Sequence, residues 1–441
     1  MKKVYSIFGA LFILVVLFTS LPFNMIVYAK SNSAYVTDGR DFSENVAWVK
    51  KDGKWICIDT KGKKLFSLKS GDTITTDFHN GVSVINNKTL INKSGKRITD
   101  KMDYDRILSP SNTAESGYYF VEKDYDTLEL TEKKVGVIDS KGKWILNLTS
   151  EKDLKYGFPR KYFGDGYFVM GDREYYTDVD IIFNIFDKTS IELKHLIDFD
   201  AKYMIYIKDK GFMSYDGYGG TFRSGYFTDF SGNTSKLFSN STYVGLLSNG
   251  SFLIGEKDNG RIVDYINDKT YDLPKYNQIE LMNTYKSYGM IKITNSGGGT
   301  FFTIIDSKGN FLFDPISIGK WSECVVSENI CTITDKDGNV ELVDFNGKII
   351  LKGIPAIYKT KEGNHKRFFS DGMIAIREKD TSDITSFSYY NKTGKKVIAS
   401  IKSTNTVAYI QAYDFSNGFA RIEENGRRYY IDKKGKLLII K

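Results

Sequence analysis

The sequence predicts an all-β protein of tandem β-hairpin or β-meander repeats that form a β-propeller or propeller-like array. Three observations favour this fold class. A turn beginning with Asp or Asn follows a short apolar strand ten times, about every forty residues. Apolar residues alternate with others, as at Val46 and Trp48, which is typical of half-buried strands. The chain has only 6 prolines but 30 tyrosines and 30 phenylalanines, which suits tightly turned sheet better than helix.

The first and last repeats match nearly position for position and define the unit. In each, a strand leads into Asp52-Gly53 or Asn425-Gly426, residue pairs that tolerate the positive φ of a hairpin turn. The next strand ends at Asp59 or Asp432. The pattern Asp-x-x-Gly that begins there predicts a type I turn capped by the Asp side chain, with Gly in the left-handed conformation. Each unit therefore has about three strands, and a fourth fits into the connection.

The turn residue that begins each repeat's second turn provides an anchor for counting. The ten anchors are Asp59, Asn92, Asp139, Asp187, Asp229, Asp264, Asp306, Asp344, Asn391 and Asp432. Ten exceeds the roughly four to eight blades of ordinary propellers. The sequence therefore allows three arrangements: two anchors share a blade, the array is open, or it is divided in two. An open stack of hairpins is the second fold we consider.

Two motifs in this repeat resemble those of the WG-repeat family of bacterial β-repeat proteins. The first motif is present as Phe42-Ser43-Glu44, Phe369-Ser370-Asp371-Gly372 and Phe415-Ser416-Asn417-Gly418. The second is present at 54–59 and 134–139, although the family's Trp-Gly pair is never intact: Trp55 lacks its Gly and Gly136 lacks its Trp. The resemblance spans most of residues 41–441. It implies the repeat fold and a binding role, and it implies no catalytic residues.

The N-terminus resembles a secretory signal peptide, which predicts a secreted or cell-envelope-associated protein. Lys2-Lys3 precede an apolar stretch, and residues 27–29 form a small-residue cleavage site after Ala29. An uncleaved membrane anchor over residues 4–27 is the alternative. We therefore expect a signal peptide at 1–29, a linker at 30–40 and the WG-like repeat domain at 41–441, so that membrane contact is transient.

The formal net charge is +8, and it falls to +6 when the two lysines of residues 1–29 are removed. Lysines and acids are interleaved along the chain, so this mildly basic balance favours simple solubility. Affinity for an anionic wall polymer or phospholipid is the functional alternative. The chain has no basic cluster typical of nucleic-acid binding, and we expect no nucleic-acid partner.

The three cysteines, Cys57, Cys324 and Cys331, do not make a disulfide scaffold. A hairpin turn at Ser327-Glu328 would place Cys324 opposite Cys331. Alignment of the repeats favours instead one continuous strand over 324–334, which would put the two thiols on opposite faces. We expect each cysteine to be a small buried thiol.

No catalytic, metal or cofactor site is predicted. His79, His195 and His365 lie in different repeats, and the chain lacks a Gly-x-Ser-x-Gly elbow, a His-Glu-x-x-His pair and a phosphate-binding Gly-Lys-Ser/Thr loop. The sequence thus favours a non-enzymatic protein that binds a protein or a cell-wall or glycan partner through its repeat surface. An extracellular polysaccharide hydrolase or lyase with a central active site is the alternative.

Aromatic residues gather around residues 215–227, where they offer a surface for stacking on sugar rings or peptide. The residues we single out for this surface are Tyr215, Tyr218, Phe222 and Tyr226. Because strand side chains alternate between faces, cross-strand packing is the competing explanation for the same residues.

Overall fold

A computed structural model gives the three-dimensional structure. It describes residues 34–108, 116–123, 134–150, 158–171, 181–193, 204–216, 224–238, 243–247, 250–256, 259–276, 278–319, 324–334, 339–355, 369–378, 386–402 and 410–441. These ranges contain strands, turns and short connections, with no α-helix among them. The expected signal peptide at 1–29 lies outside the described residues, so its cleavage remains a prediction.

The described residues form ten antiparallel sheets, numbered here in chain order. Sheets 1 to 3 contain β1 (Asp38–Gly39), β2 (Val46–Lys51), β3 (Lys54–Asp59) and β4 (Lys64–Ser67); β5 (Val82–Ile85) and β6 (Thr89–Asn92); and β7 (Arg106–Leu108), β8 (Tyr118–Lys123), β9 (Lys134–Asp139) and β10 (Trp144–Ser150). Sheets 4 and 5 contain β11 (Phe158–Gly164), β12 (Tyr167–Gly171), β13 (Ile181–Asn184) and β14 (Ser190–Glu192); and β15 (Met204–Ile207), β16 (Gly211–Asp216), β17 (Ser224–Asp229) and β18 (Thr234–Phe238).

The second half of the chain continues the same pattern. Sheets 6 to 8 contain β19 (Tyr243–Leu246), β20 (Phe252–Glu256), β21 (Asn259–Asp264) and β22 (Lys269–Asp272); β23 (Gln278–Tyr285), β24 (Tyr288–Thr294), β25 (Thr300–Ile305) and β26 (Ile316–Ser317); and β27 (Cys324–Ser327), β28 (Ile330–Thr334), β29 (Asn339–Asp344) and β30 (Ile349–Pro355). Sheets 9 and 10 contain β31 (Met373–Glu378), β32 (Ser386–Asn391) and β33 (Lys396–Lys402); and β34 (Ile410–Ser416), β35 (Phe419–Glu424) and β36 (Arg427–Asp432).

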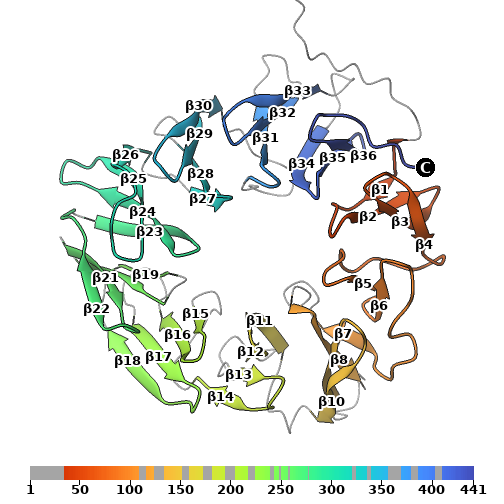
Figure 1. The fold of residues 1–441 in the computed structure, drawn as a ribbon, viewed down its shortest axis with the longest axis horizontal. Helices are drawn as coiled ribbons and strands as arrows, with labels where there is room; N and C mark the ends of the chain where they lie inside the picture. The colour runs from red at the N-terminus through yellow and green to blue at the C-terminus, as the bar shows by residue number, and fades with distance from the viewer. Residues whose placement is uncertain are drawn as a thin grey trace, which may run out of the picture.

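The ten sheets follow one another around a ring (Figure 1). In the four-stranded sheets the first strand lies toward the middle and the fourth toward the outside, as β7 and β10 or β15 and β18 show (Figure 1). The structure therefore confirms the predicted propeller-like array. It also assigns one turn anchor to each sheet, so no blade contains two anchors.

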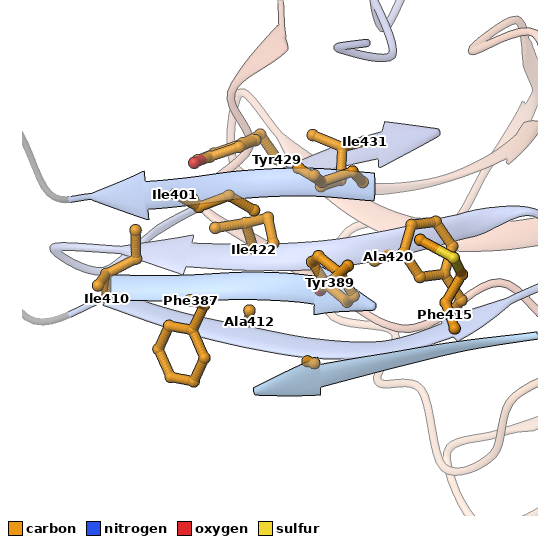
Figure 2. Close-up of a cluster of buried hydrophobic side chains, with 13 residues drawn as sticks. Phe387, Tyr389, Ile401, Ile410, Ala412, Phe415, Ala420, Ile422, Tyr429 and Ile431 are labelled. Carbon is orange, nitrogen blue, oxygen red and sulfur yellow. The ribbon is translucent and has the colours of Figure 1, made fainter. Parts of the chain in front are cut away.

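Neighbouring sheets pack face to face through their apolar side chains, because no single sheet can bury its own apolar faces. Figure 2 shows one such cluster, formed by sheets 9 and 10. Tyr389 of β32 packs edge to face on Phe415 of β34, with ring centroids 4.9 Å apart. Comparable buried clusters occur elsewhere around the ring, for example around Trp48 between sheets 1 and 2 and around Phe120 between sheets 3 and 4.

The ring closes because the first and last described segments of the chain meet between sheets 10 and 1. Val36 and Arg428 exchange two backbone hydrogen bonds of 2.9 Å, so residues just before β1 extend the last sheet. Tyr430, Leu438 and Ile440 from the C-terminal end share one buried apolar cluster with residues of sheet 1. The open stack of hairpins is therefore not the fold of this chain.

Residues 34–40, which we expected to be a linker, contribute to this closure. They include β1 and the Val36 bridge to sheet 10, and Ala34 is buried. The pairing involves so few residues that it leaves no alternation pattern in the sequence. Residues 34–40 therefore pack as part of the ring.

Candidate functional site

Two sets of turns lie on one face of the ring, and we call this the turn face. In the four-stranded sheets the inner hairpins join the first and second strands, and the outer turns begin at the anchors and join the third and fourth strands. In sheets 2, 9 and 10 the outer turns likewise begin at the anchors that end β6, β32 and β36. In an antiparallel meander these two connections lie at the same edge of the sheet. Contacts between sheets agree: Lys93 of an outer turn binds Glu44 of an inner hairpin at 2.9 Å, and Lys392 binds Glu328 at 2.8 Å.

The outer turns have the geometry that the sequence predicts. In the first, Oδ1 of Asp59 accepts hydrogen bonds from the backbone N–H groups of Lys61 and Lys63 at 2.8 and 2.9 Å, and Gly62 has φ +71°. The same two bonds recur at Asn92, Asp139, Asp229, Asp306, Asp344, Asn391 and Asp432. The anchor side chains are thus committed to shaping their turns.

The anchor of sheet 4 differs from the sequence prediction. Asn184, rather than Asp187, ends the third strand. Its side-chain Oδ1 accepts a hydrogen bond from the backbone N–H of Phe186 at 2.9 Å. The turn is one residue longer than the others, because the Asn184 N–H bonds the carbonyl of Thr189, and Lys188 takes the left-handed position with φ +62°. Because this turn is longer and has no Gly, the sequence pattern pointed to Asp187 as the anchor instead of Asn184.

The second residue of an outer turn repeatedly contacts the inner hairpin of the preceding sheet. The contact is ionic where that residue is Lys93 or Lys392. It is aromatic at Phe345, whose ring centroid lies 5.4 Å from that of Tyr288. Phe230 likewise stacks on Tyr167 of the preceding sheet at 5.5 Å. One position of the repeat therefore links neighbouring sheets by two different chemistries.

The inner hairpins also form a chain of hydrogen bonds from sheet to sheet. Ser43 Oγ donates to the Phe78 carbonyl, and Ser327 Oγ donates to the Phe369 carbonyl at 2.8 Å. Ser370 Oγ bonds the Phe415 carbonyl, and Ser416 Oγ bonds the Phe42 carbonyl across the closure. The Phe-Ser motif, which carries the family resemblance, therefore serves contacts between sheets.

The Lys93–Glu44 contact makes the free energy of unfolding depend on pH. Burial alone would raise the pKa of Glu44, but hydrogen bonds from Lys93 and from the Gly81 N–H outweigh it and hold this pKa below its ordinary value. The Glu44 carboxylate therefore binds a proton more readily in the unfolded chain than in the folded one. The stabilisation is present above about pH 4.3, the pKa of an unperturbed Glu, and is lost as the pH falls through the lower folded value.

We expect Glu44→Gln to lower the free energy of unfolding by about 1 kcal/mol or less at pH 7, as for other partly exposed ion pairs. The difference from wild type should shrink toward pH 3. Urea unfolding of the variant and the wild type at pH 7 and at pH 3 measures this difference. Glu192→Gln, at an exposed position of β14, is the control and should behave alike at both pH values. A deficit of Glu44→Gln that stays constant with pH would contradict the linkage.

An exposed aromatic group lies on the turn face at sheets 4 and 5. Phe186 and Phe230 are 53% and 37% exposed, on two successive outer turns. Beside them the Tyr206 hydroxyl donates to Asp165 Oδ2 at 2.9 Å. Burial, together with this hydrogen bond to a carboxylate, raises the pKa of Tyr206 to about 12. Sequence reasoning missed this group, although Phe186 and Phe230 stand at turn positions where apolar residues have no local role.

The aromatic surface that we predicted around residues 215–227 is placed only in part. Tyr218 and Phe222 lie outside the described residues, and the backbone of Tyr215 lies in β16. Tyr226 lies in β17 opposite Ser214 and is half-buried. Tyr215 and Tyr226 belong to adjacent strands, and an interaction surface there remains a prediction.

The cysteine arrangement that we favoured is wrong. β27 and β28 form a hairpin whose turn residues, Glu328 and Asn329, have φ values of +50° and +62°. Cys324 pairs with Ile333, so Cys331 two residues earlier lies on the same side of the sheet as Cys324. The Glu328-Asn329 pair forms this hairpin, so residues 324–334 are two strands and not one. All three cysteines are free and buried, which confirms the expected thiols.

Within the described ranges, no group of three or more His, Cys, Asp or Glu side chains is placed to hold a metal ion. Over the same ranges, no helix has the length and hydropathy needed to span a bilayer. The anchor carboxylates on the turn face shape their own turns, and Glu44 and Glu328 pair with lysines of neighbouring sheets.

The first repeat has a match among known families. Residues 37–55 match the family model of the WG containing repeat. This range contains β1, β2 and the hairpin that follows, so the resemblance inferred from the motifs holds for sheet 1. A comparison with curated proteins gives no significant match.

Several solved structures resemble the chain at low sequence identity. The computationally designed Ika8 protein is 13% identical, with a TM-score of 0.34, over 71% of this chain and 93% of that one. BamB from Moraxella catarrhalis is 10% identical, with a TM-score of 0.33, over 90% and 98%. TolB from Acinetobacter baumannii is 12% identical, with a TM-score of 0.25, over 63% and 78%. Scores this low assign no function to the chain.

Proposed function

We propose that this is a non-enzymatic binding protein of the cell envelope or the extracellular space, which holds a protein or a cell-wall or glycan partner on its turn face. The observation that supports this proposal is that the side chains of that face fall into two groups, one that shapes the turns and one that is exposed to solvent. The Asp and Asn anchors accept backbone hydrogen bonds within their own turns, whereas lysines and the aromatic rings of Phe186 and Phe230 are exposed. Exposed groups repeated around a ring suit many weak contacts with an extended partner.

The engagement of the anchor carboxylates within their own turns also favours binding over catalysis. A general acid or base must be free to exchange a proton with its substrate, and its pKa is usually tuned toward the working pH. Asp229 shows the opposite condition: hydrogen bonds from Asn233, from its side chain first and then its backbone, lower the pKa of this anchor. Such a carboxylate stays ionised and occupied by its own turn.

The proposal is tested by incubating the mature protein, residues 30–441, with purified cell wall and with a glycan and protein array. We expect saturable retention by at least one wall fraction or array component, with no soluble product released. Release of a product from any glycan would overturn the proposal in favour of a hydrolase or lyase. Failure to bind every wall fraction and array component would overturn it as well.

A further inference from the structure

Positive charge on the turn face is concentrated on half of the ring. The outer turns are taken here as six residues counted from the anchor. The turns of sheets 9, 10, 1, 2 and 3 together contain fourteen Lys and Arg and three Asp, a net charge of +11. The other five turns contain four Lys and six Asp, a net charge of −2. We call the first group the basic arc: residues 391–396, 432–437, 59–64, 92–97 and 139–144.

Only the closure of the ring makes this arc continuous. In the sequence its members lie near opposite ends of the chain, separated by almost 250 residues with the weakly charged turns between them. In the structure, sheet 10 follows sheet 9 and contacts sheet 1, so the five turns are consecutive (Figure 1). The outer turns themselves meet the closure, because the Lys441 N–H donates to the Gly62 carbonyl at 2.9 Å.

One position of the turn provides a lysine in every member of the arc. It is the fifth residue, whose backbone N–H bonds the anchor and whose position is therefore fixed. The five lysines are Lys395, Lys436, Lys63, Lys96 and Lys143, all exposed and without an ion pair in the described part of the chain. In sheets 5 and 7 the equivalent Asn233 and Asn310 fold back onto their anchors at 2.9 Å.

We propose that the basic arc binds a linear, phosphate-rich polyanion, one segment of which crosses several consecutive outer turns. This deepens the binding function proposed above and rests on it. Thirteen of the fourteen cations are lysines, and the single arginine, Arg97, is already paired with Asp72. Lysine acts on phosphate as a flexible point charge, whereas Arg fixes one carboxylate or phosphate group in place through two parallel bonds, so lysines suit a chain that presents its charge repeatedly. Equivalent lysines in successive sheets match a ligand whose charge also repeats.

The distribution of charge favours a chain over a flat anionic surface. A bilayer pressed against the turn face would meet both halves of the ring, including the six aspartates of the other five turns. Placing those carboxylates against anionic headgroups is repulsive and offsets part of the attraction to the arc. A flexible chain avoids this cost because it follows the arc alone.

The test compares two variants of the mature protein that lose the same charge. The arc variant replaces Lys63, Lys96, Lys143, Lys395 and Lys436 by Gln, which keeps every backbone bond of the turns. The control variant replaces five exposed lysines of sheets 5 to 7 by Gln: Lys208, Lys210, Lys236, Lys269 and Lys308. The probe is long-chain inorganic polyphosphate, with orthophosphate at equal total phosphate and vesicles of anionic phospholipid as the other arms.

We expect wild type and the control variant to bind polyphosphate and not orthophosphate, with affinity that falls steeply as salt rises. The arc variant should bind about tenfold more weakly or worse near 100 mM salt, with a shallower salt dependence, because it has five fewer cations to release counterions. Thermal unfolding of all three proteins confirms that each is folded.

Equal weakening in the two variants, absence of polyphosphate binding by wild type, or binding to vesicles alone would each overturn the proposed site. These results are distinguishable from failure of the proposed function. If wild type binds a wall fraction but not polyphosphate, the basic arc is refuted while the binding function stands. If wild type binds neither, both are refuted.

Discussion

Replacing Gly62 by alanine should destabilise the protein by about 3 kcal/mol or more, because this glycine is required for two independent reasons. Its φ of +71° is left-handed, which costs an L-residue roughly 1–2 kcal/mol. A Cβ atom at Gly62 would also clash with the carbonyl oxygen of Ile439, a backbone atom of the C-terminal segment, because it would lie well inside van der Waals contact distance. The segment must shift to admit the methyl group, and the closure contacts shift with it.

The matched control is Gly53→Ala at the hairpin between β2 and β3. Gly53 has a similar φ of +76°, but a Cβ there would meet no atom within 4 Å. The Gly53→Ala variant should therefore lose only the free energy needed to hold an L-residue at positive φ, roughly 1–2 kcal/mol. Urea or thermal unfolding of both variants gives the comparison. Equal losses at the two sites would mean that the C-terminal segment does not pack on the first outer turn, and would contradict the closed ring.

Ile440→Ala is expected to cost about 2–5 kcal/mol, the usual range for removing a buried aliphatic side chain from a core. Ile440 is 1% exposed and lies in the apolar cluster that joins the C-terminal end to sheet 1. The cavity left by the substitution would open between the first and last sheets. The loss should therefore weaken the closure itself, and residues at both chain ends should exchange amide hydrogens faster.

The neighbouring residue provides a control of identical chemistry. Ile439 is 39% exposed, so Ile439→Ala should change the free energy of unfolding by about 0.5 kcal/mol or less. Unfolding curves report the stabilities, and hydrogen exchange reports where the protection is lost. If Ile439→Ala proved as damaging as Ile440→Ala, or if exchange rose only at the C-terminal end, the shared cluster would not be what holds the ring closed.

These two substitutions probe a contact that also recurs inside the array. Gly95 lies against the Phe66 ring of the preceding sheet, and Gly347 lies against Phe313 in the same way. Gly62 meets Ile439 in the segment that follows the outer turn of sheet 10, so the closure repeats the packing of an outer-turn glycine on the outer edge of the preceding sheet. The ring therefore closes with an interface of the same kind as those between sequential neighbours, rather than with a special joint.

Local turn chemistry was predictable where the repeat kept its length. The Asp-x-x-Gly turns at Asp59 and Asp432 and the Asp52-Gly53 hairpin all have the expected conformations. Predictions failed where another residue took the left-handed position. Lys188 does so in sheet 4, and Asn329 does so between the two cysteine strands. A Gly signals positive φ strongly in a sequence and Asn signals it more weakly, whereas Lys adopts it only when the surrounding sheet imposes the turn.

The candidate site was less predictable than the fold. The sequence shows the aromatic stretch at 215–227, but the exposed rings of Phe186 and Phe230 lie on the same face only because successive sheets place their outer turns there. Lysines on turns look like ordinary solubilising residues when each is read in its own repeat. Their concentration on half of the ring requires the order of the sheets in space.

By itself, the sequence determined the repeating unit: strands of alternating polarity, joined by turns whose Asp, Asn and Gly residues shape the backbone within a few residues. Only the tertiary structure decided that the described residues form ten sheets in one ring and that the segment before β1 meets the last sheet as Val36 pairs with Arg428. The reason is physical. Turn geometry depends on neighbours in sequence, whereas closure depends on the small rotation between successive sheets, which packing sets and which adds up around the whole array.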